Sequence, residues 1–110
     1  MRIILKINYD ANVAIIKLMC QMIEAQPMTK EAKLVQSIIF ETLPKFQKAK
    51  NTAIENQTVF IDTKKNTITL KYHQAYALEQ LIINLIFTVN CFLAKKHLND
   101  IKDFLNQKLA

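Results

Sequence analysis

Few side chains in this 110-residue chain have the types and spacing that enzymatic chemistry needs. The single serine, Ser37, lies in a helical pattern with Glu41 four residues later and no histidine nearby in the sequence. A serine nucleophile needs a base within hydrogen-bond reach, and the pattern supplies none. We therefore expect Ser37 to be a surface residue and the protein not to be an enzyme.

The two histidines are the next candidates, for metal binding or proton transfer. His97 is followed at single-turn intervals by Asp100 and Asp103, a spacing that can hold a metal ion or tune a histidine. Lysines lie between and beside these residues and disfavour a bound cation, so we expect a solvated face and no metal site. His73 begins a helical pattern, and we expect it to cap that helix or to be hydrogen-bonded in the interior.

The two cysteines, Cys20 and Cys91, lie far apart in apolar stretches, and neither has a cysteine or histidine at metal-ligand spacing. We expect buried free thiols, which fit a reducing compartment such as the cytoplasm. Polar and charged residues interrupt every apolar run of residues 1–18, so we expect no signal peptide there.

The sequence contains no glycine. Glycine is the residue that reaches positive φ at least cost, so turns in this chain must use Asn, Asp or helical geometry. Glycine-rich phosphate loops, dinucleotide fingerprints and the G-x-S-x-G elbow are all excluded. Whole classes of nucleotide-dependent enzyme are thereby excluded, and we expect no cofactor.

The charge is positive, and most of the excess lies in the middle third. The chain has 15 basic and 9 acidic residues, for a net charge of +6, and residues 43–72 account for +4. Only Arg2 is an arginine, the usual residue for bidentate phosphate recognition, so the lysines favour diffuse attraction to anions over sequence reading. The candidates for nucleic-acid or anion contact are Lys45, Lys48, Lys50, Lys64 and Lys65.

Two interpretations of these lysines stay open. A helix followed by a hairpin with lysines at its tip has the outline of a winged-helix arrangement, in which a helix enters the major groove and the hairpin touches the backbone. A nucleic-acid-binding accessory protein or regulator is therefore our alternative function. The competing interpretation is a solvated surface whose lysines reflect the composition of an A+T-rich coding sequence.

Strand patterns occur at two places. Residues 2–9 alternate Ile3, Leu5 and Ile7 with other residues, which indicates an N-terminal strand. Residues 58–72 are rich in β-branched and aromatic residues on either side of an Asp- and Asn-bounded turn, which predicts a β-hairpin. A lone hairpin is marginally stable, so the N-terminal strand is expected to join its sheet.

Helical patterns fill most of the remaining chain. We expect a helix over 10–26 capped by Asp10, and a second from Thr29 whose apolar face includes Leu34. At Pro44 this second helix either kinks or gives way to a new one. Both helices have broad apolar surfaces.

The longest apolar pattern covers 73–93, about two-thirds of a helical circumference. Polar residues within it disfavour a membrane span. The amphipathic stretch 96–109 is expected either to continue this helix or to turn back around Asn99.

Together these patterns predict a single α+β domain over residues 1–110, mostly helical, with a small antiparallel sheet packed against three or four helices. The helices have more apolar surface than a domain of this size can cover, and surplus apolar surface is typical of an interface. We therefore expect a non-enzymatic protein–protein interaction module, working as a homo-oligomer or as a small subunit of a larger assembly. The residues expected at the interface are Leu85, Ile86, Val89, Phe92 and Leu93.

Overall fold

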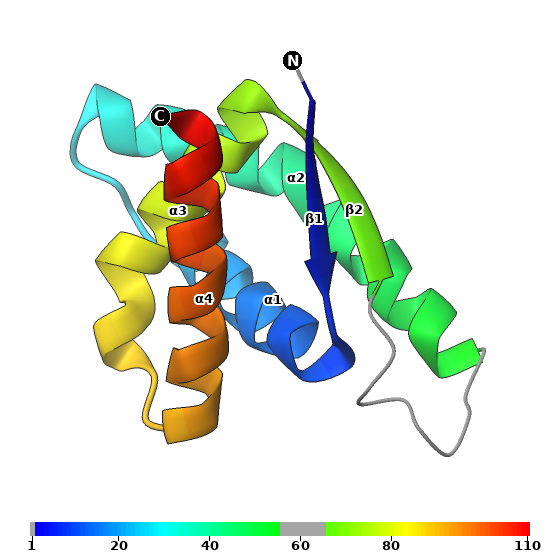
Figure 1. Ribbon diagram of the computed structural model, residues 1–110. Helices are drawn as coiled ribbons and strands as arrows, with labels where there is room; N and C mark the ends of the chain where they lie inside the picture. The colour runs from blue at the N-terminus through cyan, green and yellow to red at the C-terminus, as the bar shows by residue number, and fades with distance from the viewer. Residues whose placement is uncertain (1, 56–65) are drawn as a thin grey trace.

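The computed structural model describes residues 2–55 and 66–110. It is mostly helical with a two-stranded antiparallel sheet, which confirms the predicted α+β class. Figure 1 shows β1 and β2 side by side, with α4 running alongside β1 in the opposite direction. The elements in chain order are β1 (Arg2–Ile7), α1 (Tyr9–Glu24), α2 (Lys30–Glu55), β2 (Asn66–Lys71), α3 (Tyr72–Leu85), the short 3-10 turn η2 (Ile86–Thr88) and α4 (Phe92–Leu109).

The sheet joins the N-terminal strand to the second half of the predicted hairpin. β1 pairs antiparallel with β2 in a register that runs from Arg2 opposite Lys71 to Ile7 opposite Asn66. The expectation that the N-terminal strand joins this sheet is confirmed. The first strand predicted for the hairpin lies outside the described residues. Successive β1 side chains alternate between exposed and buried, as a half-buried strand requires.

One face of the sheet packs on a core to which all four α-helices contribute. The side chains of Ile3, Leu5 and Ile7 lie in this core. Each large apolar side chain buried in this way stabilises the fold by about 1.5–3 kcal/mol relative to exposure. Fully buried helix residues include Ile15 and Met19 of α1, Phe46 of α2, Leu78 of α3 and Leu98 of α4.

α1 begins earlier than the sequence predicts. Asn8, not Asp10, is the N-cap, because the Asn8 Oδ1 accepts a hydrogen bond from the Ala11 backbone N–H at 2.8 Å. The strand ends one residue before it, so the chain passes from β1 into α1 through a single capping residue. Asp10 lies in the first turn, where its charge favours the helix dipole.

α2 is one helix of 26 residues that runs through Pro44. The sequence left open whether a new helix would start there. Since proline has no N–H, the Phe40 carbonyl four residues earlier loses its usual hydrogen-bond donor. Phe40 lies on an exposed part of the helix, where water can take the place of that donor. The expectation that Leu34 faces inward is wrong, because its side chain is exposed.

The single helix predicted over 73–93 is wrong. α3 ends at Leu85, whose carbonyl accepts a hydrogen bond from the Thr88 hydroxyl at 2.7 Å. Val89 and Cys91 then have extended backbone, and α4 begins after them. Among the described residues no φ is positive, so the chain reverses here without the left-handed residue that glycine usually provides.

α4 starts before the stretch that was expected to be amphipathic, and it passes through Asn99 without turning. The predicted apolar face is confirmed, since Leu98, Ile101 and Leu105 are buried. None of the helices within the described ranges is long and apolar enough to span a bilayer.

Candidate functional site

The candidate nucleophile Ser37 lies on a different helix from the candidate metal ligands His97, Asp100 and Asp103. Ser37 is exposed on α2, and His97 is half-buried on α4 while Asp100 is exposed. The Asp103 carboxylate lies 3.7 Å from the Lys102 ammonium, which itself disfavours a bound cation. Within residues 2–55 and 66–110, no group of three or more His, Cys, Asp or Glu side chains is arranged to hold a metal ion.

Two expectations about individual side chains are wrong. Cys20 and Cys91 are both exposed free thiols. Beside Cys20 the inward positions of the helix are taken by Leu18 and Met19, whereas Cys91 lies in the exposed turn before α4. His73 is neither a cap nor an interior group. Its side chain is 48% exposed in the first turn of α3, with its Nε2 3.8 Å from a Glu41 oxygen.

A groove of about 600 Å³ lies between α1 and the segment that joins α3 to α4. We call it the helix groove. Its wall includes the four reactive side chains Asp10, Lys17, Cys91 and His97, together with apolar residues such as Leu93. Among the described residues no hydrogen bond or ion pair joins these four to one another, so the groove is mainly an apolar recess with polar groups on its wall.

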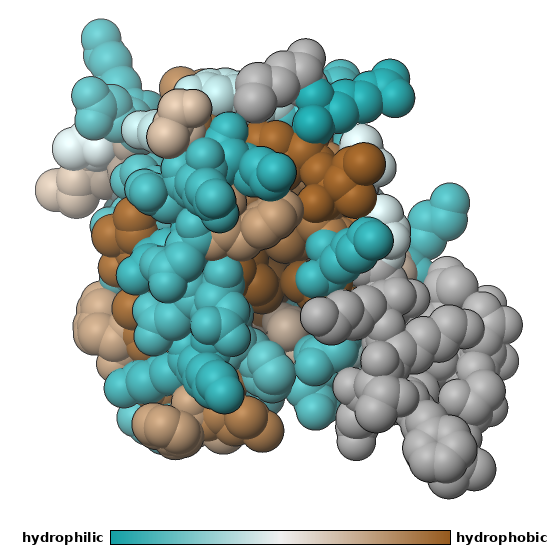
Figure 2. Space-filling model, viewed as in Figure 1, coloured by the Kyte–Doolittle hydropathy of each residue, from teal (hydrophilic) through white to brown (hydrophobic). Residues whose placement is uncertain are grey.

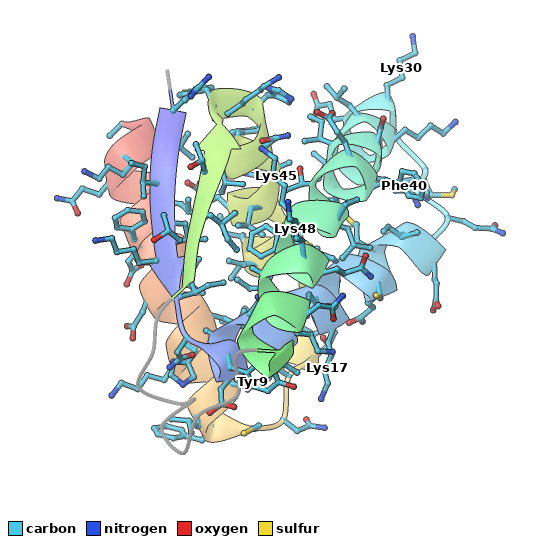
Figure 3. All side chains as sticks on the ribbon, turned by 90° about the vertical axis from the view of Figure 1, so that its right-hand side faces the viewer. Tyr9, Lys17, Lys30, Phe40, Lys45 and Lys48 are labelled. Carbon is cyan, nitrogen blue, oxygen red and sulfur yellow. The ribbon has the colours of Figure 1, made fainter. Side chains whose placement is uncertain are left out.

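Three of the five lysines predicted to contact nucleic acid lie within the described residues. Lys45 lies between α2 and β2 (Figure 3), where its Nζ donates to the Thr69 carbonyl and to Gln74 Oε1, each at 3.0 Å. Lys48 is exposed on the same helix, and Lys50 is half-buried. Lys64 and Lys65 lie outside the described residues. The nucleic-acid hypothesis therefore stays a prediction, with Lys45 already used by the fold.

Gln74 is the centre of the contacts that hold Lys45. The side chain is 2% exposed, and its Oε1 also accepts the Lys71 backbone N–H at 3.0 Å. Its Nε2 donates to Glu41 Oε1 at 3.2 Å. One buried amide thus connects α2, β2 and α3. A buried polar group is stable only when its partners are present, so this cluster fixes how α2 lies against the edge of the sheet.

The predicted oligomer interface divides into two sets. Leu85, Ile86 and Val89 are half-buried and pack against the core, whereas Phe92 and Leu93 are exposed. The chain reversal at residues 89–91 produces this division, because it folds half of the predicted apolar face onto the molecule. The exposed pair belongs to a larger surface at the turn between α3 and α4, which we call the corner patch: Ile83, Phe87, Phe92 and Leu93.

A second groove, of about 740 Å³, lies between β1 and α4, and we call it the strand groove. Figure 2 shows it as a brown hollow beside the teal ridge of α4. Its apolar lining comes from β1 and from Ile101 and Phe104, and its charged residues are Arg2, Lys6, Asp100 and Lys108. This groove was not predicted from the sequence, although the strand pattern places Ile4 on the same face as the cations Arg2 and Lys6.

Comparison of this chain with models of known protein families, with curated proteins and with solved structures finds no match.

Proposed function

We propose that this protein is a non-enzymatic protein–protein interaction module that associates through the corner patch, in the simplest case as a homo-oligomer. The observation that supports this most is the exposure of Phe87, Phe92 and Leu93, which are 75%, 82% and 53% exposed. Fully burying one such side chain in an interface is worth about 1.5–3 kcal/mol. Aromatic side chains grouped in this way are typical of the centre of an interface.

The neighbouring helix groove supports association between two copies of the chain. Leu93 belongs both to the corner patch and to the groove wall, so a projecting apolar surface and an apolar recess lie side by side. Two copies related by a two-fold axis would each place corner-patch aromatics in the recess of the other. Binding to a different subunit of a larger assembly would use the same surface.

The proposed setting is cytoplasmic. Cys20 and Cys91 are exposed and not joined in a disulfide. Exposed free thiols persist in compartments kept reducing by glutathione and thioredoxin.

Sedimentation equilibrium over a wide concentration range tests the proposal. We expect the wild-type chain to reach a mass of twice 12.8 kDa, and the Phe87→Ser/Phe92→Ser double variant to stay monomeric. Phe40→Ser is the matched control, because Phe40 is 66% exposed but lies on α2, away from the corner patch (Figure 3). It should associate like the wild type.

Two results together would contradict the proposal. One is a wild-type chain that remains monomeric at the highest concentration reached. The other is a pulldown in which the wild type and the double variant recover the same proteins.

A further inference from the structure

The direction of the backbone groups on the outer edge of β2 is fixed by two hydrogen bonds. The Thr69 carbonyl accepts from the Lys45 ammonium, and the Lys71 N–H donates to Gln74 Oε1, each at 3.0 Å. Both partners lie outside the sheet. The backbone groups of Thr69 and Lys71 therefore point away from β1.

This direction determines what β1 presents on its own free edge. In an antiparallel pair, two residues opposite each other either exchange both hydrogen bonds or both point their groups outward. Thr69 lies opposite Ile4 and Lys71 opposite Arg2, so Ile4 and Arg2 point their N–H and C=O groups away from β2. By alternation Lys6 does the same. Among the described residues, no hydrogen bond reaches the backbone groups of β1 on this side.

The strand groove lies directly along this edge. Ile101 and Phe104 of α4 provide apolar surface along β1, and residues 2–6 of the strand line the other side of the groove. The charges are unequal, since the groove has three cations, Arg2, Lys6 and Lys108, against the one carboxylate of Asp100. An unpaired strand edge beside an apolar surface is the arrangement that binds extended peptides as an added strand.

We propose that the free edge of β1 binds an extended acidic and apolar segment of a partner protein, which adds to the sheet as an antiparallel third strand. Carboxylates of that segment lie opposite Arg2 and Lys6, where opposite charges across strands are favourable. Its alternate apolar side chains point the other way, into the strand groove. Backbone hydrogen bonds provide most of the affinity, and the charge pattern selects the partner.

A second copy of this chain fits the edge less well. Outward-facing residues must lie opposite each other, so symmetric pairing that sets Ile4 against its own copy places Arg2 opposite Lys6 at both ends. Like charges directly opposite one another destabilise a strand pair. The proposal therefore concerns a surface and a partner different from those of the corner patch.

A peptide of alternating glutamate and valine with capped ends, titrated at low salt, is the probe. We expect it to bind at least about tenfold more tightly than the matched lysine–valine peptide, a difference of about 1.4 kcal/mol. In the proposed geometry the glutamate N–H groups face β1 and the valine N–H groups face away. N-methylation of the glutamates should therefore abolish binding, whereas N-methylation of the valines should preserve it.

Variants at Ile4 and at the two cations separate backbone recognition from side-chain recognition. Ile4→Pro removes an edge donor that the β1–β2 pairing does not use, and should weaken peptide binding about tenfold or more. Ile4→Thr keeps the donor and should change binding much less. The Arg2→Glu/Lys6→Glu variant should prefer the lysine–valine peptide.

Three results would overturn the proposal. The first is no binding of the glutamate–valine peptide, and the second is equal binding of the two peptides that differ in charge. The third is a wild-type dimer that Ile4→Pro converts to monomer, which would assign the edge to a second copy. A failure of the corner patch would instead appear as a dimer that survives the Phe87→Ser/Phe92→Ser change, so the two proposals fail separately.

Discussion

On both edges of the sheet, residues that lie opposite each other, such as Ile4 and Thr69, point their backbone groups outward. Among the described residues, only the edge of β2 is closed by other parts of the molecule. On β2, the outward groups of Thr69 and Lys71 are bonded to Lys45 and Gln74, and α2 packs beside them. On β1, the corresponding groups open onto the strand groove. A polar cluster around the buried Gln74 amide closes the edge of β2, and the described residues contain no equivalent cluster on the edge of β1.

An unpaired strand edge can bind a partner segment, and it can also cause aggregation. Exposed edges pair with other chains, and proteins limit this with short strands and with charged residues. β1 has six residues and presents Arg2 and Lys6 on its exposed face. These features discourage self-pairing while leaving the backbone accessible to a segment of opposite charge.

Proline substitutions should show the largest difference between the β1 residues whose backbone groups face β2 and those whose backbone groups face the free edge. Leu5 is buried, and the alternation of backbone groups along β1 directs its N–H to β2. Leu5→Pro therefore removes a hydrogen bond of the sheet and a core side chain. We expect it to lower the free energy of unfolding by about 3 kcal/mol or more. Ile4→Pro should cost less than about 1 kcal/mol, because only the free edge loses a donor. Urea denaturation measures the free energy of unfolding of both variants. Equal losses of stability would show that the Ile4 N–H does not face the free edge.

The second largest loss of stability is expected from removing the buried Gln74 amide at the edge of β2. Gln74→Ala leaves the Lys71 N–H and the Lys45 ammonium without their shared acceptor, and should cost about 2 kcal/mol. Gln80→Ala is the matched control on the same helix, since the Gln80 side chain makes no hydrogen bond to the described residues, and it should cost less than about 0.5 kcal/mol. Similar unfolding midpoints for the two variants would show that Gln74 does not stabilise the contact between α2 and the edge of β2.

The sequence predicted the strands and most of the helices because their patterns are local. The alternation in β1 and the face of α4 depend on residues that are neighbours in the chain. The end of α3 was missed because apolar residues continue through the turn at Val89 and no glycine or proline marks it. Thr88, whose hydroxyl caps that helix, has no distinctive pattern around it.

The candidate sites were less predictable because they depend on distant contacts. Lys45 meets Thr69 and Gln74 across 24 and 29 residues of chain, so a lysine count cannot distinguish it from a solvent-exposed cation. The strand groove requires β1 and α4 to lie side by side, which neither pattern reveals alone. Cys20 and Cys91 were misplaced because apolar neighbours in sequence do not fix which side of the chain faces inward.

The smallest of these effects is expected at Lys45 itself. Lys45→Met keeps the apolar stem and removes two hydrogen bonds of a partly exposed ammonium, so it should cost about 1 kcal/mol. Lys33→Met, at an exposed position of the same helix where the lysine ammonium makes no hydrogen bond to the described residues, should cost less than about 0.5 kcal/mol. Comparable losses for the two would indicate a general effect of charge, with no specific closing of the β2 edge.

The open edge of β1 is tested most directly by amide hydrogen exchange of the protein alone, followed residue by residue by NMR. Because the Ile4 and Lys6 N–H groups face the free edge, we expect these amides to exchange much faster than those of Ile3 and Leu5. The glutamate–valine peptide should slow exchange at Ile4 and Lys6. An Ile4 amide as slow as Leu5 before any peptide is added would contradict the account, because the edge would then already be paired.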